Sequence, residues 1–296
     1  MKKYLFGFLF GVLLTAFSVY VILDVFVIVR VYTPVIPENH ENVTMEPPSS
    51  EPIVTDTSYS DGNISIEITT HRAYKTNIYV ADVKLASVGY LKTAFAKDSF
   101  GKNITEKTSE MAEEKGALLA INGDFYGTLE KGCVIRNGIL YRSTLGNGRD
   151  YLVIGKDGSF EIVYEKDIDV DDLVSRGAIH VFSFGPGLIL DGEIYSGVDR
   201  YQGIGLSDNP RTAIGMIDEL HYVFVVCDGR TSESDGLTTR ELAQFMKDLG
   251  VDCAYNLDGG GSSTMYFNGK IVNKPTTYGD KIKERSVSDI VYIGYR

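Results

Sequence analysis

The chain has 296 residues, and its 40 acidic residues outnumber 29 Lys and Arg to give a formal net charge of -11. Nucleic-acid binding depends on a basic surface that neutralises phosphates, so this balance argues against a nucleic-acid partner. Three cysteines cannot form a fully paired disulfide framework, and Cys133, Cys227 and Cys253 lack the spacing of a metal site. We expect buried thiols, with a bridge between Cys227 and Cys253 as the alternative.

The first feature along the chain is an uncharged run of 20 residues, 4–23, preceded by Lys2 and Lys3. At about 1.5 Å of rise per residue, such a helix crosses the roughly 30 Å of a bilayer core. A cleaved signal peptide is the alternative, but no small-x-small cleavage motif follows at the usual distance. We expect residues 1–31 to form a cytoplasmic tip and a transmembrane anchor, with the rest of the chain outside the cell.

The composition changes after this run. Residues 32–60 contain five of the eight prolines, five acidic residues and no Lys or Arg. Such a segment cannot bury enough apolar surface to fold, and its like charges extend it. We therefore predict a Pro-rich acidic stalk over 32–60 and one folded domain over 61–296, which is long enough for a single sizeable core.

Most of the domain is predicted as short strands separated by turns. β-branched and aromatic runs bounded by turn residues indicate strands at 64–69, 78–84, 117–121, 151–154, 187–190, 222–226, 253–255, 265–267 and 290–295. Helices are expected at 105–115 and 238–249, and the second has a capping box of Thr238 and Glu241 and Gly250 as its stop. The predicted fold class is α+β: a single strand-rich, mixed-sheet domain with a few helices.

Three of the predicted strands lead into polar clusters that contain Asp124, Asp228 and Asp258. Asp-Gly and Asn-Gly pairs are common in hairpins, so each cluster alone is as easily a turn. The order strand, helix, strand over 222–258 is typical of a crossover, which makes the strands before Asp228 and Asp258 parallel. We expect the three carboxylates to meet at one sheet edge and to serve as catalytic acid, base or nucleophile.

The third cluster continues into a glycine-rich segment, residues 256–264. Successive N–H groups of such a segment form an anion-binding nest, although the Lys of a nucleotide-binding loop is absent. Arg211, Arg230 and, as a weaker candidate, Arg285 lie near predicted strand ends. A guanidinium there can bind phosphate or carboxylate, and a structural salt bridge is the alternative for each.

Other chemistries fit less well. The four histidines lie outside these clusters and no Gly-x-Ser-x-Gly elbow is present, which argues against a serine hydrolase. No cofactor is expected, although three Asp side chains could hold Ca²⁺ or Mg²⁺. Tyr126 and Tyr266 are either sugar-stacking rings or ordinary core aromatics.

The ordered series of motifs resembles the phosphodiester glycosidase family. The motifs are Asn122-Gly123-Asp124-Phe125-Tyr126, Pro210-Arg211-Thr212-Ala213-Ile214-Gly215, Asp228-Gly229-Arg230, the segment 256–264 and Glu284-Arg285, within about 64–295. The resemblance implies hydrolysis of a sugar-1-phosphodiester on its glycosidic side, in proteins often linked to exopolysaccharide biosynthesis. Together with the predicted nest, the candidate substrate- or phosphate-binding residues are Asn122, Arg211, Arg230, Asn256, Gly259, Gly260, Gly261, Ser262, Ser263, Thr264 and Arg285.

The combined prediction is a membrane-anchored hydrolase outside the cytoplasm. Its expected substrate is a glycosyl phosphodiester, such as a GlcNAc-1-phosphate diester in an envelope glycan or exopolysaccharide, and its other partner is the membrane. Two alternatives remain open. One is a non-catalytic glycan-binding or assembly protein of the envelope, and the other is a cation-dependent phosphodiesterase that cuts the P–O bond.

Overall fold

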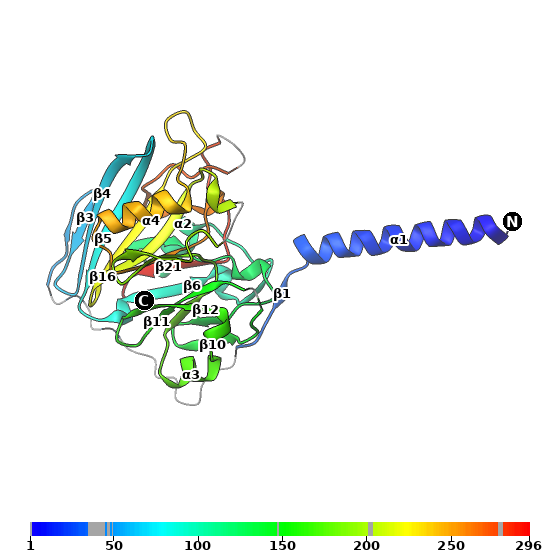
Figure 1. The fold of residues 1–296 in the computed structure, drawn as a ribbon, viewed down its shortest axis with the longest axis horizontal. Helices are drawn as coiled ribbons and strands as arrows, with labels where there is room; N and C mark the ends of the chain where they lie inside the picture. The colour runs from blue at the N-terminus through cyan, green and yellow to red at the C-terminus, as the bar shows by residue number, and fades with distance from the viewer. Residues whose placement is uncertain are drawn as a thin grey trace.

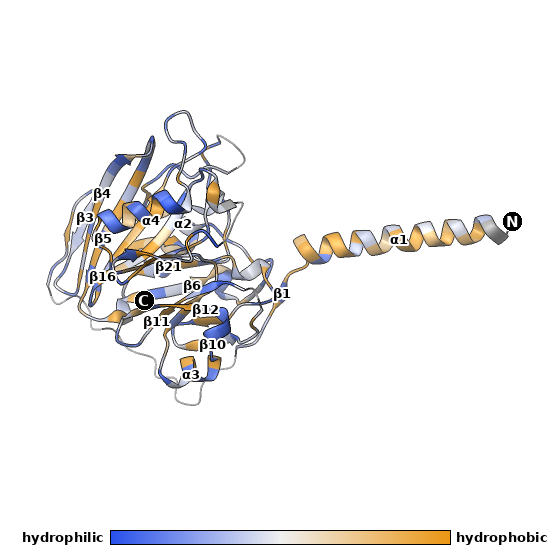
Figure 2. Ribbon diagram, viewed as in Figure 1, coloured by the Kyte–Doolittle hydropathy of each residue, from blue (hydrophilic) through white to orange (hydrophobic). Residues whose placement is uncertain are grey.

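The computed structural model of the protein describes residues 2–34, 45, 48, 50–146, 148–200, 204–277 and 281–296. One long helix, α1 Lys2–Phe26, projects from a strand-rich body (Figure 1). It is apolar along most of its length (Figure 2), and its segment Tyr4–Phe26 is long and apolar enough to cross a membrane. The other helices of the described residues are α2 Thr108–Lys115, α3 Val170–Ser175 and α4 Thr239–Asp248.

The strands of the described residues form three larger sheets and one short pair. The nine-stranded sheet, in the order β15-β14-β18-β16-β17-β5-β4-β3-β2, contains β2 Ile53–Val54, β3 Ser58–Ser60, β4 Ile64–Ala73, β5 Thr76–Leu85, β14 Gly187–Leu190, β15 Glu193–Ile194, β16 Arg211–Asp218, β17 His221–Cys227 and β18 Cys253–Asn256. The central five-stranded sheet, β20-β19-β8-β21-β6, contains β6 Leu91–Phe95, β8 Leu119–Asn122, β19 Met265–Phe267, β20 Lys270–Ile271 and β21 Asp289–Ile293. The lateral five-stranded sheet, β10-β9-β13-β11-β12, contains β9 Val134–Arg136, β10 Ile139–Arg142, β11 Asp150–Ile154, β12 Phe160–Tyr164 and β13 His180–Phe182. The short pair is β1 Arg30–Val31 with β7 Gly101–Lys102.

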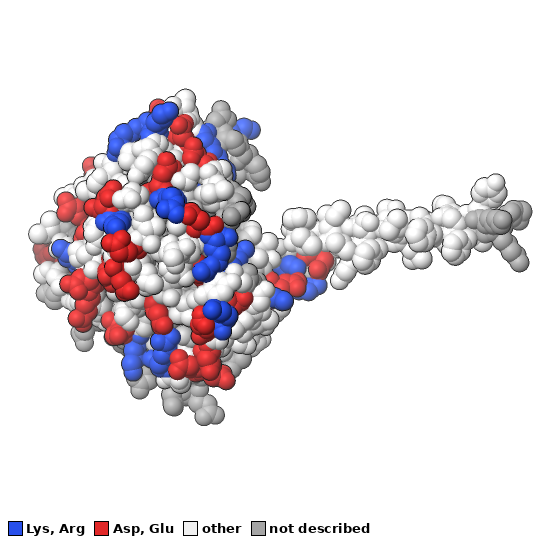
Figure 3. Space-filling model, viewed as in Figure 1, with Lys and Arg blue, Asp and Glu red and all other residues white. Residues whose placement is uncertain are grey.

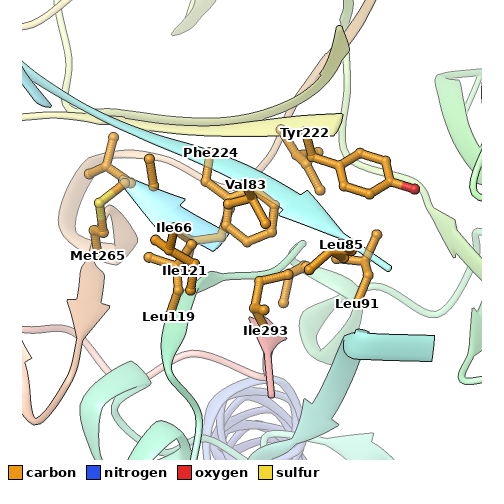
Figure 4. Packing of buried hydrophobic residues seen from close by; sticks show 14 of the residues in the cluster. Ile66, Val83, Leu85, Leu91, Leu119, Ile121, Tyr222, Phe224, Met265 and Ile293 are labelled. Atoms are coloured by element: carbon orange, nitrogen blue, oxygen red, sulfur yellow. The ribbon is translucent and has the colours of Figure 1, made fainter. Parts of the chain in front are cut away.

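The main core lies between the nine-stranded sheet and the central five-stranded sheet. Side chains from β4, β5 and β17 face side chains from β6, β8, β19 and β21 across this space (Figure 4). The opposite face of the nine-stranded sheet is covered by α4, and the opposite face of the central sheet by α2. The layers are therefore helix, sheet, sheet, helix, and the lateral sheet adds Leu152, Ile154 and Phe182 to the main core.

Strand β17 shows how the sequence produces this layering. Tyr222, Phe224 and Val226 point into the core between the sheets, while Val223 and Val225 point toward α4. Successive side chains of a strand alternate between the two faces, so a strand covered on both sides needs a continuous apolar run. The run 222–226 has that composition, and for this reason the sequence predicts the strand well.

The α+β fold class is confirmed, and every strand expected from the sequence is present with shifted ends. The sheets are not mixed, however, because all strand pairs among the described residues are antiparallel. Helix α2 begins at Thr108 rather than 105, because Glu106 forms a β-bridge with Val287. In α4, Thr238 Oγ1 accepts from the Glu241 N–H at 3.2 Å, which confirms the capping box.

The predicted crossover is present in a modified form. Strands β17 and β18 each pair antiparallel with β16, which lies between them, so the two run parallel to one another. Their carboxyl ends therefore lie at the same edge of the sheet, as expected. The same register prevents a disulfide: Cys227 lies opposite Arg211 at one end of β16 and Cys253 opposite Met216 near the other. All three cysteines are free and buried.

The predicted stalk over 32–60 is wrong for its final residues. Strand β3 pairs with β4, β2 pairs with β3, and Tyr59 is buried in the main core. Apolar strand residues at 53, 54 and 59 supply this pairing although the segment as a whole is acidic and rich in proline. The folded unit thus begins before residue 61, while residues 35–44, 46, 47 and 49 of the predicted stalk lie outside the described residues.

Replacing Thr238 by Ala removes the side-chain cap of α4, and we expect the unfolding free energy to fall by about 1 kcal/mol. The measurement is urea unfolding of the full chain in detergent. Thr238→Ser keeps the hydroxyl and is the matched control, which should lose less than half as much. An unchanged midpoint for Thr238→Ala would show that the cap does not stabilise this helix.

Candidate active site

A pocket of about 460 Å³ opens at the edge of the nine-stranded sheet where β18 ends and β16 begins. This is within the usual volume of a small-molecule site. Its described lining residues are Phe125, Arg149, Phe184, Gly185, Pro186, Gly205, Asn209, Arg211, Arg230, Thr239, Asn256, Asp258, Gly259, Gly260 and Arg285. They include four arginines and a single acidic residue, so the pocket carries excess positive charge.

Three of the predicted site residues reach the pocket because they share one face of the sheet. Ala213 and Ala254 point toward α4, and two-residue alternation places Arg211 and Asn256 on the same side, with Asp258 beyond the end of β18. Thr239, the first residue of α4, closes this side of the pocket. Strand register thus decides which polar residues face the pocket.

Asp258 is held in a fixed orientation by groups on both of its oxygens. Its Oδ2 accepts from Ser262 Oγ at 2.6 Å and from Arg285 Nη2 at 3.1 Å, and its Oδ1 accepts from the Gly259 N–H at 2.9 Å. Burial raises the pKa of Asp258, and Arg285 and the hydrogen bonds oppose that rise. The result is a positioned carboxylate whose pKa lies above its ordinary value.

The arginines around the pocket are held by different partners. Arg211 donates to the backbone carbonyls of Leu237 and Ser207, both at 2.8 Å, while Arg230 donates to Asn209 Oδ1 at 2.8 Å. Among the described residues, no carboxylate lies within ion-pair distance of Arg230. Its backbone is left-handed, at φ 61°, a conformation that costs energy in a residue with a side chain and is concentrated at functional sites.

The glycine-rich segment does not form the predicted anion nest. The Gly259 N–H binds Asp258, the Gly260 N–H donates to the Pro210 carbonyl at 2.8 Å, and the Ser263 N–H donates within the turn at 3.2 Å. The glycines serve close packing instead: a Cβ on Gly259 would lie 2.9 Å from the Pro210 oxygen. The segment shapes the pocket wall, and the N–H groups of Gly259, Gly260 and Ser263 already have acceptors within the protein.

Asp124 does not line the pocket, which corrects the expectation of three converging carboxylates. It is buried, its Oδ1 lies 3.0 Å from Arg136 Nη2, and its Oδ2 accepts from the Ser183 N–H at 2.9 Å. Arg136 also binds Asp289, with Nη2 2.9 Å from Oδ2. A buried arginine that the sequence did not single out therefore holds Asp124 inside the fold.

Asp228 is also placed outside the pocket lining. Its Oδ2 accepts from Tyr79 Oη at 3.0 Å and its Oδ1 from the Lys274 N–H at 2.8 Å, so it fastens the loop after β20 to the nine-stranded sheet. Burial raises its pKa despite these bonds. The parallel carboxyl ends of β17 and β18 place Asp228 and Asp258 at one edge, but only Asp258 turns into the hollow.

Several other predicted binding residues are structural in their contacts. Asn122 is fully buried and joins strand ends, and Gly261, Ser262, Ser263 and Thr264 lie behind the pocket lining. Tyr126 stacks on Phe100 with ring centroids 5.1 Å apart, and Tyr266 packs against the α2 side of the central sheet. Both tyrosines are core aromatics.

Comparison with known proteins shows the family of this chain. The family model described as Phosphodiester glycosidase matches residues 115–294. This chain belongs to the phosphodiester glycosidase family. Its matched region contains every residue of the pocket lining.

Relatives of known sequence align with different shares of this chain. A Bacillus subtilis (strain 168) protein described as SPbeta prophage-derived uncharacterized protein YomE is 31% identical over 202 residues, which are 66% of this chain and 31% of that protein. N-acetylglucosamine-1-phosphodiester alpha-N-acetylglucosaminidase of Mus musculus is 29% identical over 186 residues, 57% of this chain and 35% of the mouse protein. This chain thus spans about a third of the length of these curated relatives.

A solved structure shares the fold. The catalytic domain of zebrafish N-acetylglucosamine-1-phosphodiester alpha-N-acetylglucosaminidase aligns with a TM-score of 0.61 and 23% identity, over 88% of this chain and 91% of that chain. A hypothetical protein from Synechocystis aligns with a TM-score of 0.57 and 14% identity, over 78% of this chain and 62% of that chain. Both matches extend the likeness to most of this phosphodiester glycosidase domain.

Sequence reasoning missed several residues of the phosphodiester glycosidase pocket. Phe125 is 38% exposed at its rim, and Phe184 lies beside Arg149. Asn256 was expected from the sequence, and its buried Oδ1 has no hydrogen-bond partner among the described residues. Phe125 lies inside the Asn122–Tyr126 motif, next to Tyr126, for which the alternative of a core aromatic is the correct one. Nothing in the local sequence marks Arg149 or Phe184.

The option of a Ca²⁺ or Mg²⁺ ion at the three Asp residues needs a gathered set of oxygen donors. Within the described part of the chain, no group of three His, Cys, Asp or Glu side chains is placed to hold a metal. Asp124 and Asp228 are instead bound to Arg136 and to Tyr79. These three Asp residues therefore do not supply the group of oxygen donors that a Ca²⁺ or Mg²⁺ site requires.

The buried cluster of Arg136, Asp124 and Asp289 predicts a pH effect on stability. Burial, reinforced by Asp124, raises the pKa of Asp289 well above its ordinary value, although Arg136 opposes the rise. The folded state then keeps a proton that the unfolded state releases, so the unfolding free energy falls as the pH rises from the ordinary carboxyl range to the raised pKa. One proton corresponds to a slope of about 1.4 kcal/mol per pH unit.

Asp289→Asn cannot titrate, and we expect it to remove most of that slope while the fold persists. Chemical unfolding at several pH values measures the effect, and Asp252→Asn, which makes the same change in an exposed carboxylate, is the control. An identical pH dependence in wild type and Asp289→Asn would contradict the prediction.

Proposed function

We propose that this protein hydrolyses the glycosidic bond of a sugar-1-phosphodiester. The observation that carries the proposal is a pocket with one positioned carboxylate, Asp258, among four arginines. Membership of the phosphodiester glycosidase family supports the reaction class, and the activity for which the mouse relative is named supports N-acetylglucosamine as the sugar. The proposal concerns the activity of the whole protein, whereas the relatives resemble only part of it.

The arginines would bind the phosphate of the substrate. Guanidinium groups donate paired hydrogen bonds to phosphate oxygens, and a charge-assisted bond is about twice as strong as a neutral one. Arg230 lies against Gly260, with Nη2 2.9 Å from where a Cβ would stand, and Arg285 borders the same wall. Charge on the departing phosphate would be stabilised by groups already in place.

Asp258 would act as the general base for water. The water oxygen bonds to the anomeric carbon, the bond from that carbon to the phosphate oxygen breaks, and its electron pair leaves with the phosphomonoester. The proton of the water passes to Asp258. A base works best when its pKa approaches the working pH, and burial moves the pKa of Asp258 in that direction.

The sugar would lie on the aromatic side of the pocket. Phe125 and Phe184 line the hollow, and Asn256 offers a buried amide oxygen. A sugar ring packs its apolar face on an aromatic ring and directs hydroxyls to such acceptors. Phe125 thus takes the role that the sequence suggested for Tyr126 and Tyr266.

We further propose that the protein is anchored in the membrane by α1, with its domain outside the cytoplasm and its substrate in an envelope glycan or exopolysaccharide. Lys2 and Lys3 before the span favour a cytoplasmic N-terminus. Residues directly after the helix pair with the body as β1, which a segment removed with a signal peptide would not do. This supports retention of the helix.

Asp258→Asn should lower kcat/KM for a GlcNAc-1-phosphate diester by at least about 100-fold, the typical contribution of a general base. Asp228→Asn is the matched control, because it makes the same change in a buried carboxylate outside the pocket and should keep most activity. Release of free sugar by the folded variants is the measurement. Equal activity of both variants would reject Asp258 as the base, and binding without release by wild type would favour a glycan-binding protein.

Arg230→Ala should weaken inhibition by inorganic phosphate about 10- to 100-fold, because bonds from a charged group contribute about 1.5–3 kcal/mol. Arg176→Ala removes an arginine that follows α3 outside the pocket lining, and it serves as the control. The inhibition constant is measured at fixed ionic strength. Equal constants for the two variants would remove Arg230 from the phosphate site.

A further inference from the structure

We propose that the pocket is held at the membrane surface and acts on a glycosyl phosphodiester whose aglycone is a membrane lipid. This inference rests on the proposed function and adds the substrate class. It follows from the contacts of Lys102 and Asn103 with the end of α1 and from the bond between Asn103 and the loop that leads to the pocket rim. These contacts replace the expected spacer by a direct attachment.

The end of α1 is fastened to the body by two side chains, Lys102 in β7 and Asn103 directly after it. Asn103 Nδ2 donates to the Ile28 carbonyl at 2.9 Å, and the buried Lys102 Nζ lies 3.8 Å from Asp24 Oδ2 and 3.1 Å from Glu130 Oε1. Charged residues gather where the helix meets the body, while the helix itself is uncharged for most of its length (Figure 3). The charged cluster marks the point where the chain leaves the apolar layer.

Strand pairing continues this attachment beyond the helix. Arg30 and Val31 pair with Lys102 and Gly101, and a Cβ on Gly101 would lie only 2.0 Å from the Arg30 carbonyl oxygen. Only glycine permits this close approach. The Tyr32 N–H also donates to the Phe100 carbonyl at 2.9 Å. The chain therefore joins the folded body within four residues of the end of α1.

Residues 100–103 also support the loop that leads to the pocket rim. The Asn103 N–H donates to the Gly127 carbonyl at 3.1 Å, and Phe100 stacks on Tyr126. Phe125, which lines the pocket, is two residues from Gly127, a distance of at most about 7 Å along the chain. One residue, Asn103, thus contacts both the end of the membrane helix and the loop that carries the pocket rim.

The length of α1 sets the height of this junction. Residues 4–23 cover about 30 Å, the thickness of the hydrocarbon core, so Asp24 and Arg30 fall in the headgroup layer, which is about 5–7 Å thick. Because Lys102 and Asn103 contact that stretch, the pocket rim lies close to the same layer. Four pocket arginines would then meet lipid-linked phosphates at the depth where those phosphates lie.

In this geometry the lipid part of the substrate stays in the bilayer and its sugar enters the pocket. Water adds to the anomeric carbon, the bond to the phosphate oxygen breaks, and the phosphomonoester remains on the lipid. The free sugar leaves into water. The attachment through β1 and β7 supplies a high local substrate concentration without a new binding contact.

The height of the pocket is tested without activity by labelling Thr128→Cys on full-length protein in phosphatidylcholine–phosphatidylglycerol vesicles. Thr128 is exposed next to the rim, and the native cysteines are buried, so a maleimide dye reacts selectively. Glu67→Cys on β4, on the side of the body away from α1 (Figure 1), is the control. Headgroup-quencher lipid should quench the dye at 128 at least several-fold more than at 67. Equal quenching would overturn the proposal.

The substrate class is tested with two diesters of GlcNAc-1-phosphate in the same vesicles, one with hexadecanol and one with methanol. A twelve-residue Gly/Ser insertion between Leu23 and Asp24 moves the body away from the span by about 20 Å. It leaves the contacts of Lys102 and Asn103 and the pairing of β1 with β7 in place. We expect this variant to lose at least tenfold on the hexadecyl diester and to retain its rate on the methyl diester.

Turnover of the methyl diester alone, or an insertion without effect, would overturn the lipid substrate and leave the proposed function intact. Absence of turnover with both diesters would overturn the proposed function and this inference together.

Discussion

The arrangement of the site depends on one buried amide, the side chain of Asn122 at the end of β8. Its Nδ2 donates to the Asp258 carbonyl at 2.7 Å, and its Oδ1 accepts from Thr212 Oγ1 at 2.8 Å and from the Thr264 N–H at 3.3 Å. These bonds join the central sheet to the ends of β16 and β18. An unsatisfied buried amide would be costly, so the packing of the two sheets and the position of Asp258 are coupled. A residue expected to bind substrate is therefore the joint that positions the catalytic candidate.

The distribution of charge separates the folded interior from the pocket. Inside the fold, the guanidinium of Arg136 binds two carboxylates, Asp124 and Asp289. Burial raises the pKa of Asp289, and the negative charge of Asp124 adds to this rise, because one arginine cannot balance two buried carboxylate charges. In the pocket, arginines outnumber the single acid, Asp258. An interior must neutralise its charges, whereas a binding site gains affinity from charges that a ligand completes. The acidic surface of the protein as a whole gives no sign of this local excess.

The attachment of α1 connects the end of this helix with the loop that carries Phe125, although the two lie far apart along the chain. Gly101 allows β1 to approach, Asn103 binds the end of the helix, and the same segment supports the loop that ends in Phe125. A flexible spacer would let the body rotate freely above a membrane, but paired strands and a buried Lys102 restrict that freedom. In the proposed membrane-anchored protein, the fold would thereby set the orientation and the height of the pocket.

The sequence by itself determined the elements whose causes are local. Alternating and continuous apolar runs predicted the strands, the Thr238 cap predicted α4, and the length of the uncharged run predicted α1, because these depend on neighbours within a few residues. Only the tertiary structure decided which acid faces the pocket. Asp124 and Asp258 both follow strands and precede aromatic or glycine residues. Arg136, at the end of β9 in another sheet, binds Asp124 inside the fold, whereas Asp258 lines the pocket. Partners brought together by sheet register and packing are not encoded by local spacing, and that is why the site needed the fold.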